Sequence, residues 1–135
     1  MTIFTAKAKW TEGMRFEANG NSGHPLLIDG DSKVASSPMD LVLEALCACT
    51  AVDVVSILQK KREPFTAVEV SASAEKAGDP PRVYTSIELL YRVAGNVSRK
   101  AAEDAVRLSE EKYCSVAAML NKTAKITYRI ELDAS

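Results

Sequence analysis

Three cysteines are the side chains best suited to a chemical reaction in this chain of 135 residues. Cys47 and Cys49 share one apolar segment, and Cys114 lies far beyond them. A thiolate is a nucleophile, and its oxidation to a sulfenic acid or a disulfide is reversible. The Cys-x-Cys spacing, with His24 as the single histidine, does not match the usual zinc-ligand spacings. The pattern favours redox or catalytic use, or plain burial, and we expect no metal ion and no cofactor.

The three cysteines have different surroundings in the sequence. Cys49 falls in the middle of a predicted helix, where the helix dipole acts weakly and apolar burial keeps a thiol inert. It needs a cation from elsewhere in the fold, and Arg15 is a candidate. Cys114 directly precedes a short predicted helix, whose free N–H groups can stabilise a thiolate, at a break where access is easier. Cys47 lies about 200° around the helix from Cys49, so one of the two is expected to pack in the core.

A long helix must position Cys49, and its start is marked clearly. Ser37 suits the N-cap, Pro38 suits the first helical position, and Asp40 can complete a capping box three residues after the cap. Basic residues at 60–62 suit the negative end of the helix, and Pro64 prevents much further extension. We therefore predict a helix from residue 38 to about residue 61.

Alternating apolar and polar residues predict strands on both sides of this helix. A helix capped by Ser98 is predicted to run to about residue 112, and a short one from Ser115 to about Asn121. The predicted strands cover residues 3–10, 14–18, 26–28, 68–74, 83–93 and 124–132. Because the strands arrive as hairpins, the order β-β-β-α-β-β-α-α-β predicts an α+β fold with antiparallel sheets around a long buried helix, in a single domain, 1–135.

The long helix is apolar on nearly every face between residues 41 and 58. A helix of this kind must be covered all round, and one sheet of a short chain covers one face. We therefore predict that a second copy of the chain covers the rest, as a homodimer. The stretch is about as long as a membrane span, but Glu44 and Asp53 would be costly in lipid, which argues against a membrane. Both acids are assigned a structural role before a catalytic one.

The charge balance excludes one class of partner. The 17 basic and 18 acidic residues give a net charge of −1, without a long run of one sign. A nucleic-acid-binding surface is therefore not expected. The N-terminus has the alternation of a strand rather than the pattern of a secretory signal, so a cytoplasmic location is expected.

Two cysteine motifs make the chain resemble the OsmC/Ohr family. Within that family, it most resembles the YhfA-like branch. Residues 37–41 and 45–50, Ser-Pro-Met-Asp-Leu and Ala-Leu-Cys-Ala-Cys-Thr, resemble the first cysteine helix of that family. Residues 110–116, Glu-Glu-Lys-Tyr-Cys-Ser-Val, resemble the second motif, and residues 13–16 resemble the strand that carries the arginine. The resemblance covers nearly the whole chain and implies the OsmC-like fold, an intertwined homodimer with its sites at the interface.

The resemblance also implies an activity, the reduction of organic hydroperoxides to alcohols. The cysteine at the position of Cys49 would attack the peroxide, and the cysteine at the position of Cys114 would resolve the sulfenic acid as a disulfide. An external dithiol would then reduce the disulfide. The arginine at the position of Arg15 would hold the thiolate and polarise the peroxide oxygen. Cys47 would be a packing residue.

One position departs from the family pattern. In the peroxidase branches, a glutamate ten residues before the first cysteine pairs with the arginine, and Met39 occupies that position here. Asp40 is adjacent, but one helical step rotates a side chain by about 100°. Two alternatives therefore remain beside a peroxidase. One is a non-peroxidatic dimer that binds a small apolar or reactive ligand at the interface, and the other is a thiol redox sensor.

Overall fold

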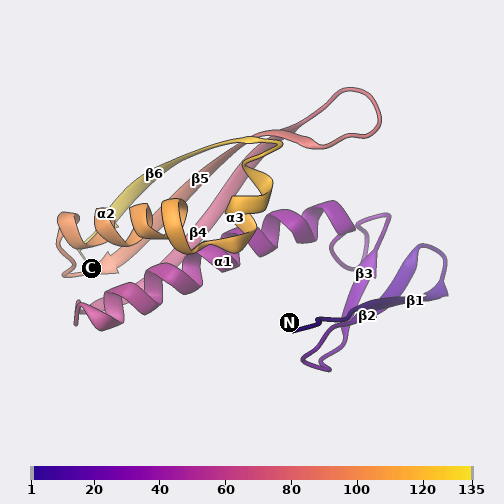
Figure 1. Ribbon diagram of the computed structural model, residues 1–135, viewed down its shortest axis with the longest axis horizontal. Coiled ribbons are helices and arrows are strands. Elements are labelled where there is room, and N and C mark those ends of the chain that lie inside the picture. Colours follow the sequence, from indigo (N-terminus) through magenta and orange to yellow (C-terminus); the bar gives the residue numbers. More distant parts are fainter. Residues whose placement is uncertain (1, 135) are drawn as a thin grey trace. The chain divides into compact units, whose positions relative to one another are not determined.

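The computed structural model describes residues 2–134, and the chain forms two compact units, residues 1–44 and 45–135. The first unit holds a three-stranded antiparallel sheet in the order β1-β2-β3 (Figure 1). Its first strand begins later than the alternation predicted, while the other two lie within one residue of their predicted bounds. The strands are β1 (Lys7–Glu12), β2 (Arg15–Asn19) and β3 (Leu26–Asp29).

A buried aspartate organises the loop after β3. The carboxylate of Asp29 accepts hydrogen bonds from the backbone N–H groups of Asp31, Lys33 and Val34 at 2.9–3.0 Å. These bonds hold the pKa of Asp29 below its usual value, and the bond from Val34 has the largest effect. The loop leads directly to the start of the long helix, so this carboxylate fixes the path of the chain into it.

The long helix α1 (Pro38–Lys60) begins with the predicted capping box. The N–H of Asp40 donates to Ser37 Oγ at 3.2 Å, and the N–H of Ser37 donates back to Asp40 Oδ2 at 3.2 Å. Both bonds satisfy N–H groups that a helix start leaves without partners. The helix ends within one residue of the predicted position.

The second unit holds the rest of α1 and a three-stranded sheet in the order β4-β5-β6 (Figure 1). The element after α2 is a single π-helical turn, η1, where a continuous α-helix was predicted. The remaining elements are β4 (Phe65–Lys76), β5 (Tyr84–Gly95), α2 (Arg99–Leu108), η1 (Ser109–Tyr113), α3 (Ser115–Leu120) and β6 (Lys125–Asp133).

The antiparallel prediction is wrong for one strand pair. β4 and β5 form the predicted antiparallel hairpin, but β6 runs parallel to β5, with Leu89 opposite Tyr128. A parallel pair needs a long crossover connection, and α2, η1 and α3 provide it. The α+β class and the OsmC-like architecture are unaffected.

The core of the second unit lies on one face of this sheet. Every second residue of β5 from Ile87 to Val93 is buried, while the opposite face carries ion pairs between Arg92 and Glu131 and between Arg129 and Glu88. The buried β5 residues of this row are Ile87, Leu89, Tyr91 and Val93. Since Tyr91 contacts η1, the helical elements cover the buried face.

α1 is buried along one stripe in the single chain. The buried side chains recur every four residues, at Leu46, Thr50, Val54 and Leu58. Val52, on another face, is 67 % exposed. Within residues 2–134, α1 is the one helix long and apolar enough to cross a membrane by length and composition. Asp53, near the middle of this helix, accepts a hydrogen bond from Ser109, and a carboxylate at that position would be costly in lipid.

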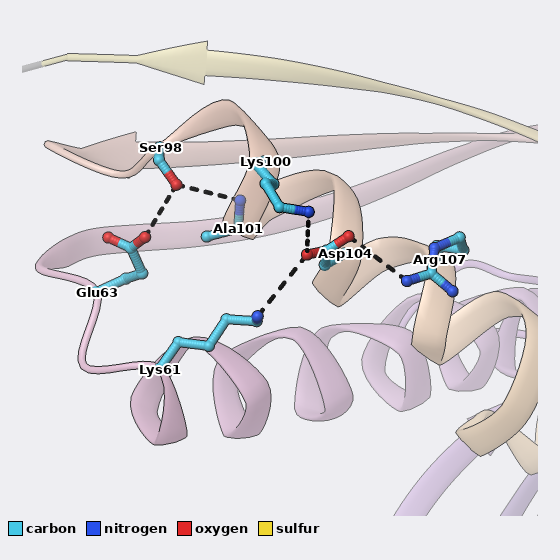
Figure 2. A network of polar contacts seen from close by, with 7 residues as sticks. All are labelled: Lys61, Glu63, Ser98, Lys100, Ala101, Asp104 and Arg107. Atoms are coloured by element: carbon cyan, nitrogen blue, oxygen red, sulfur yellow. Dashed lines mark hydrogen bonds and ion pairs between the residues drawn. The ribbon is translucent and has the colours of Figure 1, made fainter.

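Polar contacts join the end of α1 to α2 (Figure 2). The carboxylate of Asp104 lies 3.4 Å from Lys100, 3.5 Å from Arg107 and 3.8 Å from Lys61. Burial acts to raise the pKa of Asp104, but the cations outweigh it and hold that pKa below its usual value. Because Lys61 directly follows α1, the network fixes α2 against it and sets the path toward the second cysteine.

Candidate thiol site

Cys49 and Cys114 come together in the second unit. Cys49 is half-buried in the middle of α1, and Cys114 is the N-cap of α3 and 3 % exposed. Both are free thiols, and the Cys49 side chain interacts with Cys114 and helps to raise its pKa. The fold therefore places two thiols from distant parts of the sequence close enough to interact.

Cys114 is a protonated thiol at neutral pH. The N–H of Ala117 donates to its sulfur at 3.3 Å, as predicted for a cysteine at a helix start. Burial nevertheless raises the pKa of Cys114 to about 12, and Cys49 and the charge of Asp53 add to the rise. The predicted easier access and thiolate character of Cys114 are therefore wrong. One N–H donor does not offset the loss of water around the sulfur.

A π-helical turn delivers Cys114 to this position. The N–H of Cys114 donates to the carbonyl oxygen of Ser109 at 2.9 Å, five residues back. Such turns insert one extra residue into a helix and often occur at functional sites. The first residue of this turn is itself anchored, because the hydroxyl of Ser109 donates to Asp53 Oδ2 on α1 at 2.8 Å.

A second buried contact anchors the same turn to the sheet. The hydroxyl of Tyr91 on β5 donates to Glu110 Oε1, and Thr50 on α1 also interacts with that hydroxyl. Burial and Glu110 raise the pKa of Tyr91 far above its usual value, so the phenol stays protonated. Burial also raises the pKa of Glu110, although the hydrogen bond from Tyr91 opposes the rise. The thiols thus lie beside two carboxylates, a phenol and hydroxyl groups.

The chain matches one family over most of its length. The family model for OsmC-like protein matches residues 30–129. The chain belongs to the OsmC-like family. It is 46 % identical over 132 residues to Protein YhfA of Escherichia coli strain K12, covering 96 % of this chain and 98 % of YhfA.

Solved structures agree with this assignment. A hypothetical protein from Aquifex aeolicus VF5 superposes with a TM-score of 0.85 at 30 % identity, covering 98 % of this chain and 99 % of that one. The organic hydroperoxide resistance protein OhrB of Bacillus subtilis superposes with a TM-score of 0.66 at 14 % identity, covering 96 % and 98 % of the two chains. At that identity the likeness to OhrB shows a shared fold.

The arginine expected in an OsmC-like site has a partner that the sequence did not suggest. Arg15 lies on β2, and its Nη1 atom is 3.0 Å from Glu12 Oε1 in the same hairpin. Asp40 accepts hydrogen bonds from Ser32 and from the N–H of Ser37, so its carboxylate serves the helix start. The adjacent Met39 lies in the first turn of α1. A carboxylate for Arg15 thus comes from β1 rather than from α1.

The other sequence assignments concern Cys47 and metals. Cys47 lies on α1, half-buried, and its carbonyl oxygen accepts a hydrogen bond from Thr50 Oγ1 at 3.1 Å. Its assignment to packing in an OsmC-like protein stays a prediction. Among residues 2–134, no group of three or more His, Cys, Asp or Glu side chains is placed to hold a metal ion.

Sequence reasoning missed most of the polar groups around the thiols. Asp53 was assigned a structural role, yet it lies four residues after Cys49 and therefore on the same face of α1. Tyr91 lies in the buried row of β5, where a tyrosine needs a hydrogen-bond partner. Both signals were available from periodicity. Ser109 carried no comparable signal, because its role depends on the π-helical turn.

Proposed function

We propose that this OsmC-like protein is a thiol-dependent peroxidase that reduces organic hydroperoxides. The observation that carries the proposal is the interaction between Cys49 and Cys114, which come from separate elements of the second unit. The hydroperoxide resistance protein OhrB shares the fold, which supports the same substrate class.

Cys49 is the peroxidatic residue in this proposal. Its half-buried side chain is the more accessible of the two, whereas Cys114 is 3 % exposed. The Cys49 thiolate attacks the outer oxygen of the hydroperoxide, an S–O bond forms and the O–O bond breaks. One proton reaches the departing alkoxide, so the products are a sulfenic acid and an alcohol. Arg15 would polarise the peroxide oxygen.

Cys114 is the resolving residue. Its sulfur displaces the hydroxyl group of the Cys49 sulfenic acid, which gives a disulfide and water. A neighbouring thiol protects the sulfenic acid from further, irreversible oxidation. An external dithiol returns the disulfide to two thiols and completes the cycle.

The decisive experiment follows thiol loss. Adding cumene hydroperoxide to the reduced protein is expected to consume two thiols per chain, with formation of the Cys49–Cys114 disulfide detected by mass spectrometry of peptides. Cys49→Ser abolishes the reaction, Cys114→Ser stops it at a sulfenic acid that dimedone captures, and Cys47→Ala is the matched control with full activity. Unchanged thiols in the reduced wild type would exclude a peroxidase.

We place this peroxidase in the cytoplasm as an intertwined homodimer. Large apolar side chains of the first unit are exposed in the single chain, among them Trp10 at 62 % and Phe4 at 77 %. Exposed apolar area of this kind is typical of an interface. Sedimentation velocity at low protein concentration tests the dimer directly.

A second candidate function is ligand binding without peroxide chemistry. A groove on α1 is lined almost entirely by apolar atoms, and Ala48 and Val52 line it close to Cys49 in sequence. Met39 at the family's acid position favours this candidate. It predicts that a fluorescent apolar probe binds equally well to the wild type and to the double variant Cys49→Ser, Cys114→Ser. Binding lost with both thiols would reject it.

A further inference from the structure

We infer that Asp53 is a catalytic residue for disulfide formation, its carboxylate accepting the Cys114 thiol proton as Cys114 attacks the modified sulfur of Cys49. The inference rests on the proposed roles of the two cysteines. It adds a base to the second half of the reaction. On sequence alone, Asp53 was assigned a structural role instead.

The positions of three side chains carry the inference. Asp53 lies one helical turn after Cys49 on α1, so both point to the same side of the helix. Asp53 Oδ2 accepts the Ser109 hydroxyl at 2.8 Å, and the Ser109 carbonyl oxygen accepts the Cys114 N–H at 2.9 Å. Ser109 therefore binds the Asp53 carboxylate through its hydroxyl and the Cys114 N–H through its carbonyl oxygen, so both residues lie beside Ser109.

Cys114 needs a base inside the protein. Its side chain is 3 % exposed, so bulk water has little access to its proton. Burial raises its pKa to about 12, so spontaneous ionisation at neutral pH is rare. A resolving thiol in this state reacts faster when a nearby group takes the proton during attack.

The other titratable groups near Cys114 are less suited to the role. Tyr91 keeps its proton because burial and Glu110 raise its pKa far above the usual value. The Glu110 carboxylate is bonded to the Tyr91 hydroxyl, and Glu110 is not among the main groups that shift the pKa of Cys114. The sulfur of Cys49 is itself the atom that Cys114 attacks, so it cannot act as the base. The charge of Asp53, by contrast, acts directly on Cys114.

The step balances without a further reagent. The Cys114 sulfur forms a bond to the Cys49 sulfur while the S–O bond of the sulfenic acid breaks. The Cys114 proton passes to the Asp53 carboxylate and then to the departing hydroxide, which leaves as water. The oxidant is the organic hydroperoxide that formed the sulfenic acid, and the carboxylate is regenerated.

The test isolates the attack of Cys114 from any peroxide chemistry. In a Cys47→Ala background, Cys49 is converted to its mixed disulfide with thionitrobenzoate, and release of the yellow thiolate reports attack by Cys114. Cys114→Ser gives no release and validates the assay. We expect Asp53→Asn to slow release by about 10²-fold, within the usual range for general-base catalysis, and to remove one ionisation from the pH profile. Asp53→Glu restores that ionisation.

Ser109→Ala is the matched structural control. It removes the hydrogen bond to Asp53 but keeps the carboxylate, so release slows far less than in Asp53→Asn and the pH profile keeps its ionisation. An unchanged or faster rate in Asp53→Asn would overturn the inference, because it would mean that the carboxylate merely holds the proton on Cys114. Equal losses of rate in Asp53→Asn and Ser109→Ala, with no change of pH profile, would overturn it too.

A second arm uses the complete reaction with cumene hydroperoxide. Asp53→Asn is expected to form the Cys49 sulfenic acid at the wild-type rate and to accumulate it, together with sulfinic acid. If the hydroperoxide leaves Cys49 unreacted in every protein while thionitrobenzoate release still depends on Asp53, the peroxidase proposal fails and the role of Asp53 stands.

Discussion

The hydroxyl of Tyr91 on β5 donates a hydrogen bond to the carboxylate of Glu110 on η1, although nineteen residues separate them in the chain. Tyr91 is fully buried, and Glu110 is half-buried. Buried polar groups are stable only with partners, so each side chain depends on the other. The pair fixes the π-helical turn to the sheet, four residues before Cys114.

The first prediction concerns the strength of this pair. Tyr91→Phe leaves a half-buried carboxylate without its donor and is expected to lower the free energy of unfolding by about 1–3 kcal/mol. Glu110→Ala leaves the buried Tyr91 hydroxyl without its acceptor and is expected to act in the same direction. In urea unfolding, the double variant should lose less than the sum of the single variants, with a coupling of about 0.5–3 kcal/mol. Strict additivity would show that the two groups do not interact.

The second prediction concerns the pH dependence that Glu110 creates. Burial raises its pKa in the folded protein, so the folded state binds this proton more tightly than the unfolded state. Its contribution to stability is complete below the pKa of Glu110 in the unfolded chain, near 4.5, and is lost as pH rises through the folded pKa. Urea unfolding from pH 4 upward should show that loss in the wild type. The slope should be smaller in Glu110→Gln, and identical slopes would contradict the prediction.

Local features of the fold could be predicted from the sequence because their causes are local. The capping box of Ser37 and Asp40 depends on residues three apart, and alternation placed both ends of β5 within two residues. The parallel pairing of β6 could not be predicted in this way, because a hairpin and a crossover produce the same alternation. The thiol pair came from family resemblance, since its spacing holds no geometric information about tertiary contact.

The burial of Cys114 shows the limit of sequence reasoning at the site itself. Its position before α3 correctly predicted an N–H donor to the sulfur. The same position suggested access, but burial depends on how η1 packs against α1 and β5. The π-helical turn that determines this packing needs tertiary anchors at Ser109 and Glu110, which no local pattern marks. The electrostatic balance at Cys114 therefore follows from the fold.

The third prediction concerns Gly95 at the end of β5. Its φ is +110°, and an added Cβ would lie 2.5 Å from the Pro64 carbonyl oxygen and 2.8 Å from Phe65 Cα. Gly95→Ala must therefore strain the backbone and push β4 away, and we expect a large loss of thermal stability or failure to fold. Gly78→Ala is the control, because nothing lies within 4 Å of its added Cβ. Equal melting temperatures for the two variants would refute the argument.

The fourth prediction concerns the start of α2 (Figure 2). Ser98 Oγ accepts the N–H of Ala101 at 3.1 Å and donates to Glu63 at 3.0 Å. Ser98→Ala is expected to lower the free energy of unfolding by about 1 kcal/mol, the usual loss for an N-cap residue. Ser98→Asp keeps the cap acceptor but places a second carboxylate beside Glu63, so it should recover the loss better at high salt than at low salt. Chemical unfolding at two ionic strengths measures both effects.

The last prediction follows the Cys114 thiol into alkaline solution. Its pKa is raised from 9.0 to about 12, mainly by burial, so the folded state holds this proton at a pH where the unfolded chain releases it. The resulting stability is complete below about pH 9 and is lost progressively as pH rises through the folded pKa. Cys114→Ser keeps an N-cap oxygen for the Ala117 N–H and removes the titration. Between pH 8 and pH 11, unfolding free energies of the wild type should therefore fall more steeply than those of Cys114→Ser. Parallel curves would mean that Cys114 titrates alike in both states, which would contradict the burial of its sulfur.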